Sequence, residues 1–187
     1  MFNVLKNRIY TLKKNYFYPS LNRLDENILE VGCGKGDNIK YFPYTSNIYV
    51  TDRKIRKNTL SKNLHRPNLV FKECKIEELP FKSNFFDVVV FTFVLCSVKS
   101  VDKSIHEIQR VLKPNGKLIF IEHVASKYKI LAILQNIYSI PFSYLTNCHP
   151  NRNPLNKFSK NNFQILHKKY IEYNYFSRLL FVKKKKK

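Results

Sequence analysis

The stretch N-I-L-E-V-G-C-G-K-G-D-N, residues 27–38, decides the fold of this chain. An apolar run leads into three alternate glycines, Gly32, Gly34 and Gly36, and the whole chain holds only four glycines. Glycine adopts positive φ angles without strain and lets a ligand lie directly against the backbone. In a chain so poor in glycine, three of them in one turn are informative. The pattern predicts a buried strand followed by a glycine turn that binds a ligand.

Apolar runs and helical segments alternate through the rest of the chain. The segment after the turn is predicted to be a helix over 37–42, ending before Pro43. A second helix is expected after Ser100, and an apolar helix over 128–145 suits a cover over the active site. Strands are predicted at 48–50, 69–71, 87–92 and 117–121, with a last hairpin at 164–170 and 175–182.

The spacing of the glycines narrows the class of ligand. The turn reads G-x-G-x-G, with Glu30 two residues before the first glycine, whereas the dinucleotide fingerprint is G-x-G-x-x-G. The Lys-Ser/Thr pair of a P-loop is absent after the turn, which excludes that motif. Asp52 ends the second predicted strand about twenty residues later, where an acid can accept both ribose hydroxyls of an adenosine. A helix N-cap before Arg53 is the alternative role for Asp52.

Composition separates the ends of the chain from its centre. The net charge is +21, and the basic surplus lies mainly in the two ends, which predicts contact with RNA or an anionic membrane. Biased composition is the alternative explanation. Residues 1–20 are expected to be a basic leader or helix, residues 21–182 one domain, and residues 183–187 a polylysine tail. No apolar run reaches the length of a membrane span, so we expect a cytoplasmic protein with peripheral membrane association at most.

The four cysteines lack C-x-x-C spacing, and the histidines are spread along the chain. Reduced cytosolic thiols and no metal site are therefore expected.

Six segments occur in an order that resembles a known family. They are E-V-G-C-G-K-G (30–36), C-K-I-E-E-L-P-F (74–81), V-L-C-S-V-K (94–99), E-I-Q-R-V-L-K-P-N-G (107–116), E-H-V (122–124) and N-C-H-P-N-R (147–152). Together they resemble class I S-adenosylmethionine-dependent methyltransferases of the type 11, ubiquinone-biosynthesis-like kind. Within that class the chain is most similar to the methyltransferase-like protein 7 branch, over about residues 20–182. The resemblance implies a Rossmann-like seven-stranded sheet with helices on both faces and an antiparallel last strand.

The resemblance also implies S-adenosyl-L-methionine as the cofactor. Glu30 would then suit the cationic end of the cofactor. Lys75 stands where many relatives carry an acid against the adenine, and Glu77 is expected to substitute for that acid. The expected cofactor-binding residues are Glu30, Gly32, Cys33, Gly34, Gly36, Asn38, Asp52, Arg53, Ile76, Glu77 and Thr92.

Members of this branch methylate small thiols, so a small-molecule thiol is the expected methyl acceptor. Candidates for catalytic roles are Cys96, His123 and His149, with Cys148 beside them. The alternative for each of these residues is a role in packing or hydrogen bonding. Two other functions stay open: an RNA methyltransferase that uses the basic ends, and a non-catalytic basic module that binds nucleic acid or membrane.

Overall fold

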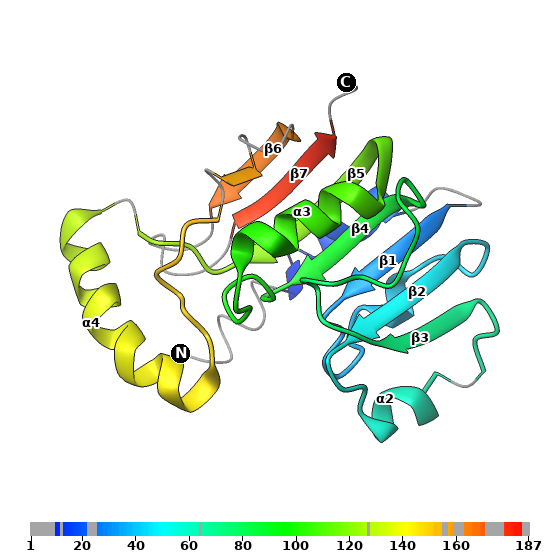
Figure 1. Ribbon diagram of the computed structural model, residues 1–187, viewed down its shortest axis with the longest axis horizontal. Coiled ribbons are helices and arrows are strands. Elements are labelled where there is room, and N and C mark those ends of the chain that lie inside the picture. The colour runs from blue at the N-terminus through cyan, green and yellow to red at the C-terminus, as the bar shows by residue number, and fades with distance from the viewer. Residues whose placement is uncertain are drawn as a thin grey trace.

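The centre of the computed structural model is one β-sheet with helical segments against both faces (Figure 1). The structure describes residues 10–11, 13–21, 26–63, 65–126, 128–154, 157–158, 163–170 and 178–184. Five strands are parallel and lie in the order β3-β2-β1-β4-β5. They are β1 (Asn27–Val31), β2 (Asn47–Asp52), β3 (Leu69–Glu73), β4 (Phe86–Thr92) and β5 (Leu112–Glu122). The predicted α/β, Rossmann-like fold with a central parallel sheet is confirmed.

Two more strands extend the sheet beyond β5. β7 (Arg178–Lys184) pairs antiparallel with β5, and β6 (Phe163–Tyr170) pairs antiparallel with β7. Residues 175–177 of the predicted last strand lie outside the described residues, as do residues 1–9 of the predicted leader and residues 185–187 of the tail.

Side chains that alternate in direction along the parallel strands form one hydrophobic core on each face of the sheet. Because successive side chains of a strand point to opposite faces, Leu29 and Val89 join one core while Ile28 and Val88 join the other. Both sets are fully buried, which is why these runs are apolar throughout rather than alternating.

Helix α3 (Val101–Val111) covers the first of these two cores. Ser100 caps it, accepting a hydrogen bond from the Lys103 backbone N–H. The other core is closed by η2 (Tyr18–Leu21) before β1 and by η3 (Ile39–Tyr41) after the glycine turn. Another short segment, η1 (Lys13–Phe17), directly precedes η2. A short helix, α2 (Lys57–Ser61), follows β2.

The helix predicted over 37–42 was wrong in type. Only η3, one turn of 3₁₀ helix, forms there. Backbone hydrogen bonds from Gly36 N to Cys33 O and from Ile39 N to Gly36 O close two successive tight turns at the start of this segment. Pro43 then ends the segment before an α-helix can propagate. The glycine turn therefore presents backbone N–H groups without a long helix behind it.

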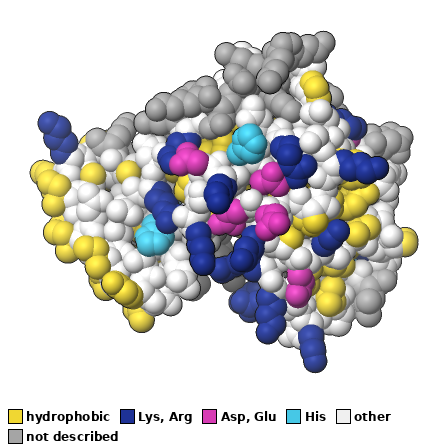
Figure 2. Space-filling model, in the orientation of Figure 1, with side chains coloured by type: hydrophobic (Ala, Val, Ile, Leu, Met, Phe, Trp, Pro, Cys, Tyr) yellow, Lys and Arg dark blue, Asp and Glu magenta, His cyan; other side chains and the backbone are white. Residues whose placement is uncertain are grey.

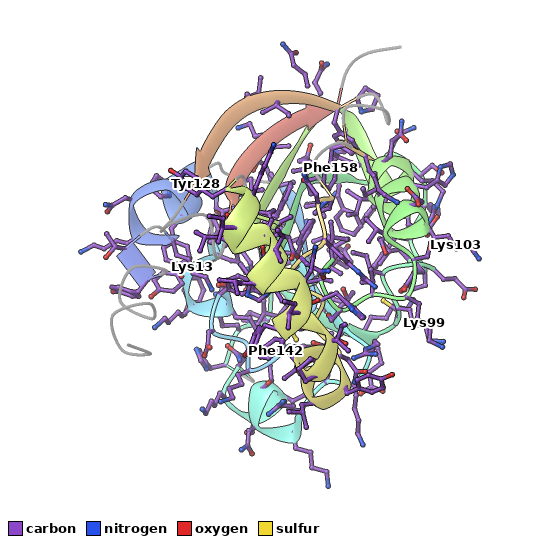
Figure 3. All side chains as sticks on the ribbon, turned by 90° about the vertical axis from the view of Figure 1, so that its left-hand side faces the viewer. Lys13, Lys99, Lys103, Tyr128, Phe142 and Phe158 are labelled. Carbon is purple, nitrogen blue, oxygen red and sulfur yellow. The ribbon has the colours of Figure 1, made fainter. Side chains whose placement is uncertain are left out.

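Helix α4 (Lys129–Thr146) projects beside the sheet rather than packing flat against it (Figure 1). Apolar side chains line its free side in the surface view (Figure 2). In Figure 3, Tyr128 lies at the N-terminal end of α4, and Phe142 lies on the helix before its last turn. Gln135 anchors it by donating hydrogen bonds to the carbonyls of Val124 and Pro150. Among the described residues, no helix combines the length and apolarity needed to cross a bilayer.

Candidate active site

A pocket of ≈ 220 Å³ opens at the carboxyl edge of the sheet, beside β1, β2 and β4. Neighbouring strands β1 and β4 mark the point where the strand order reverses, which is where open α/β sheets bind ligands. The lining residues come from the ends of four strands and from the turn after β4. They are Val31, Gly32, Asp52, Arg53, Cys74, Lys75, Ile76, Glu77, Phe93, Val94, Ser97, Val98 and Lys99.

The three glycines of the turn all have positive φ, from +54° at Gly34 to +73° at Gly36. A Cβ at Gly32 would meet Val94 Cγ2 at 2.5 Å, so the backbone there lies against the turn after β4. A Cβ at Gly34 would meet nothing within 4 Å. The turn therefore needs glycine for two reasons: its backbone conformation at all three positions, and close approach at Gly32 and Gly36.

Asp52 links the glycine turn to the tip of β2. Its Oδ2 accepts a hydrogen bond of 2.8 Å from the Gly34 N–H, and the carboxylate lines the pocket. The predicted N-cap role is weak, because the nearest bond of this kind, from Lys54 N to Oδ1, is 3.5 Å long. The side chain is half-buried, which leaves it accessible to a ligand.

Five of the eleven predicted cofactor residues lie on the pocket wall: Gly32, Asp52, Arg53, Ile76 and Glu77. Glu77 also accepts hydrogen bonds from the backbone N–H groups of Lys99 and Ser100, so its Oε1 is already engaged. The other six predicted residues do not line the pocket wall. They are Glu30, Cys33, Gly34, Gly36, Asn38 and Thr92.

Glu30 was expected to contact the cofactor. Its side chain lies beneath the turn and does not line the pocket wall. It is 1% exposed, and its Oε1 accepts a 2.8 Å hydrogen bond from Asn38 Nδ2. Lys13 Nζ donates to Asn38 Oδ1, and Asn38 Nδ2 lies 3.5 Å from Thr92 Oγ1. Burial raises the pKa of Glu30 to about 7, against the opposing effect of the Asn38 hydrogen bond. Glu30 thus supports the turn through Asn38.

The raised pKa predicts a pH-dependent stability that Glu30→Gln should remove. The folded protein binds this proton more tightly than the unfolded chain, where the pKa is near 4.5. The stabilising contribution is full below about pH 4.5 and is lost as the pH rises through about 7. Glutamine keeps the acceptor for Asn38 but carries no charge, so its advantage over wild type should grow from about pH 5 to about pH 8. Urea unfolding at both pH values measures this.

Glu78→Gln is the control, because it makes the same substitution at an exposed glutamate. A difference between Glu30→Gln and wild type that is equal at both pH values would contradict the assignment of a buried, protonated Glu30.

The turn after β4 supplies pocket residues that were not among the predicted cofactor-binding residues, although their segment was part of the family resemblance. Val94, Ser97, Val98 and Lys99 all line the pocket. The buried carboxylate of Glu122 stabilises the turn by accepting hydrogen bonds from the backbone N–H groups of Val94 and Leu95. The available signal was the position of this apolar run at the carboxyl end of a buried strand.

Three of the predicted catalytic candidates meet beside this turn. His123 Nδ1 lies 3.4 Å from Cys96 Sγ and 3.2 Å from Cys148 Sγ. The hydrogen bond from Cys96 lowers the pKa of Cys148 to about 5, helped by His123, while the pKa of Cys96 is raised. His149 lines a separate cavity near the end of α4, and its backbone N–H donates a hydrogen bond to the Cys96 carbonyl.

The ring of Phe93 separates this Cys96–His123–Cys148 cluster from the pocket. Phe93 lines the pocket and stacks on His123 with ring centroids 4.6 Å apart. Its φ of +57° is unusual for a bulky residue, and a backbone bond to Ile121 O holds it there. Helix α4, expected as a cover, contributes no residue to the pocket wall.

The residues present fit S-adenosylmethionine. The Asp52 carboxylate at the tip of β2 suits ribose hydroxyls, and Ile76 offers an apolar surface to an adenine. The space above Gly34 lets a ligand lie on bare backbone.

Comparison with known proteins agrees with this fit. Residues 29–120 match the family model described as Methyltransferase domain. Thiol S-methyltransferase TMT1B of Rattus norvegicus is 33% identical, with 73% of this chain and 59% of that protein covered. The ubiquinone/menaquinone biosynthesis C-methyltransferase UbiE of Rickettsia bellii is also 33% identical, with 70% of this chain and 58% of that protein covered. The chain thus spans under two thirds of the length of each.

Solved structures share the fold. Geranyl diphosphate C-methyltransferase from Streptomyces coelicolor, in complex with Mg²⁺, geranyl diphosphate and S-adenosyl-L-homocysteine, superposes with a TM-score of 0.75 at 11% identity. The superposition covers 95% of this chain and 81% of that one. Together with the glycine turn and the strand order, these matches show that the chain belongs to the methyltransferase-domain family of class I, S-adenosylmethionine-dependent methyltransferases.

Proposed function

We propose that this protein transfers the methyl group of S-adenosylmethionine to a small-molecule thiol. The observation that carries the proposal is the pocket at the strand ends, where the Asp52 carboxylate lines the wall beside the glycine turn. The similarity to a thiol S-methyltransferase at 33% identity supports the thiol as acceptor. The family match over residues 29–120 includes the pocket-lining residues of all four strand ends.

When bound, S-adenosylmethionine supplies an electrophilic sulfonium methyl group. Gly32 and Asp52 of this chain would fix the position of the cofactor, and Ile76 would contact its adenine. Val94 and Val98 give the pocket an apolar side that excludes water. Alignment and water exclusion are what the chain must provide, because methyl transfer is an in-line displacement that depends on geometry.

A thiol acceptor needs little help to ionise, since its ordinary pKa is about 8.5. His123 has its Nδ1 directed at the two cluster thiols. His149, the other predicted base, lines a different cavity. Neither histidine lines the cofactor pocket, so the acceptor thiol depends on its own acidity to ionise.

Methylation at carbon is the second candidate, favoured by the UbiE relative at the same identity as the thiol methyltransferase. The two candidates share the cofactor site and differ only in the acceptor. RNA as the acceptor stays a prediction from the basic ends of the chain.

One assay separates these acceptors. Purified protein is incubated with S-adenosylmethionine labelled in the methyl group and, in parallel, with small alkyl and aryl thiols, quinols and short RNA. Label transferred to thiols, and lost when the thiol is replaced by the matching alcohol, supports the proposal. Label found on a carbon atom of a quinol, with none on thiols, would contradict thiol methylation and support methylation at carbon. Label recovered in RNA alone would support the third.

A further inference from the structure

Cys96, His123 and Cys148 come from three separate parts of the fold. Cys96 lies in the turn after β4, His123 directly follows β5, and Cys148 lies in the loop after α4. One ligand atom from each, two sulfurs and one imidazole nitrogen, lies within 4.8 Å of the others. Cys96 is buried, and the other two side chains are half-buried. The spread of these residues along the sequence predicted no metal site, yet the fold gathers them in one place.

The spacing of the three atoms matches tetrahedral coordination of zinc. With Zn–S bonds of about 2.3 Å and a Zn–N bond of about 2.0–2.1 Å, tetrahedral angles place sulfur and nitrogen about 3.6 Å apart. The two Sγ to Nδ1 distances, 3.4 and 3.2 Å, are slightly shorter than this. Small movements outward would accommodate the ion. Two thiolates and an imidazole are soft donors that select zinc over magnesium or calcium.

Neighbouring groups hold the three ligands in place. The Phe93 ring stacks on His123 with its plane inclined by 28°. Arg152 Nη1 donates to the carbonyls of Leu95 (3.1 Å) and Val98 (2.7 Å), which ties the loop that carries Cys148 to the turn that carries Cys96. Supporting contacts of this kind orient metal ligands and raise the affinity of the site.

We propose that Cys96, His123 and Cys148 form a binding site for a zinc ion. Three protein ligands leave one tetrahedral position for water or another small ligand, the arrangement of sites that keep an open position. The ion would fasten the loop over 146–153 to the carboxyl edge of the sheet, next to the pocket. Removing the ion should therefore loosen that loop.

The test is metal binding by the full chain, purified under reducing conditions and stripped with a chelator. Titration with Zn²⁺ against a chromophoric competitor should show one tight site. Co²⁺ in its place should give the visible absorption of a tetrahedral site and a thiolate-to-metal charge-transfer band. Loss of an outer contact to a metal ligand costs about 10–100-fold in affinity, so losing a ligand itself, in Cys148→Ser or His123→Asn, should cost at least about 100-fold.

Cys74→Ser and His106→Asn are the matched controls, since Cys74 follows β3, three strands away from β4, and His106 is exposed on α3. Both should bind zinc as the wild type does. Circular dichroism of each stripped variant establishes that it is folded. A folded, reduced wild type that binds no Zn²⁺ would overturn the proposal. Zinc bound equally well by Cys148→Ser and His123→Asn would also overturn it, because the ion would then lie elsewhere.

Discussion

Asp52→Asn is expected to weaken the binding of S-adenosylhomocysteine by at least about 100-fold. The Asp52 carboxylate lies on the pocket wall at the tip of β2, where it can accept both ribose hydroxyls. Hydrogen bonds to a charged group contribute about 1.5–3 kcal/mol each, so two of them correspond to roughly 10²–10⁴ in affinity. Asparagine removes the charge and one acceptor, but keeps an oxygen that can accept from Gly34. Calorimetric titration of each protein measures the change.

Glu73→Gln is the matched control for this substitution. Glu73 ends β3, the strand next to β2, and accepts a 2.8 Å hydrogen bond from the Ile55 backbone N–H. It is a strand-tip carboxylate with a structural bond, but it does not line the pocket. Its replacement should leave the affinity within a few-fold of wild type. If Asp52→Asn and Glu73→Gln weaken the binding of S-adenosylhomocysteine equally, the effect of Asp52→Asn would come from disturbing the ends of the strands and not from a lost contact with the ligand.

Gly32→Ala is expected to destabilise the folded protein by about 2–5 kcal/mol. An alanine at φ +68° carries the strain of the left-handed region, about 1–2 kcal/mol. Its Cβ would also lie 2.5 Å from Val94 Cγ2, and overpacking of this kind costs about 1–3 kcal/mol. Urea unfolding measures the sum.

Two further variants separate strain from overpacking. Gly34 has a φ of +54°, and a Cβ there would lie in open space. Gly34→Ala should therefore destabilise the protein only by the cost of backbone strain. In the double variant Gly32→Ala/Val94→Ala the contact is removed, so Gly32→Ala should cost less there than in wild type. If Gly32→Ala costs the same with and without Val94, the close approach of the turn to β4 contributes nothing to its need for glycine.

The sequence was most informative where a local pattern alone determines the structure. The apolar, β-branched run over 87–92 has to be a buried strand, and β4 occupies 86–92. Asp52 was placed because the carboxyl ends of parallel strands meet at one edge, so a residue at a strand tip can be assigned to the pocket. The glycine turn was recognisable because only glycine tolerates its φ angles.

Residues whose role depends on tertiary contacts could not be placed in this way. Glu30 sits in a strand buried on both faces, and only the position of Asn38 shows that its carboxylate supports the turn from below. Cys96, His123 and Cys148 are more than twenty residues apart, and no spacing rule joins them. Their meeting depends on the ends of β4 and β5 and on the path of the chain after α4.

The central claim is that the pocket beside the glycine turn binds S-adenosylmethionine. Calorimetric titration of the full wild-type protein with S-adenosylhomocysteine, alongside NAD, tests it directly. The account predicts saturable binding of one S-adenosylhomocysteine per chain and no binding of NAD, because the turn reads G-x-G-x-G and lacks the G-x-G-x-x-G spacing of dinucleotide sites. Folded protein that fails to bind S-adenosylhomocysteine, or that prefers NAD, would contradict it.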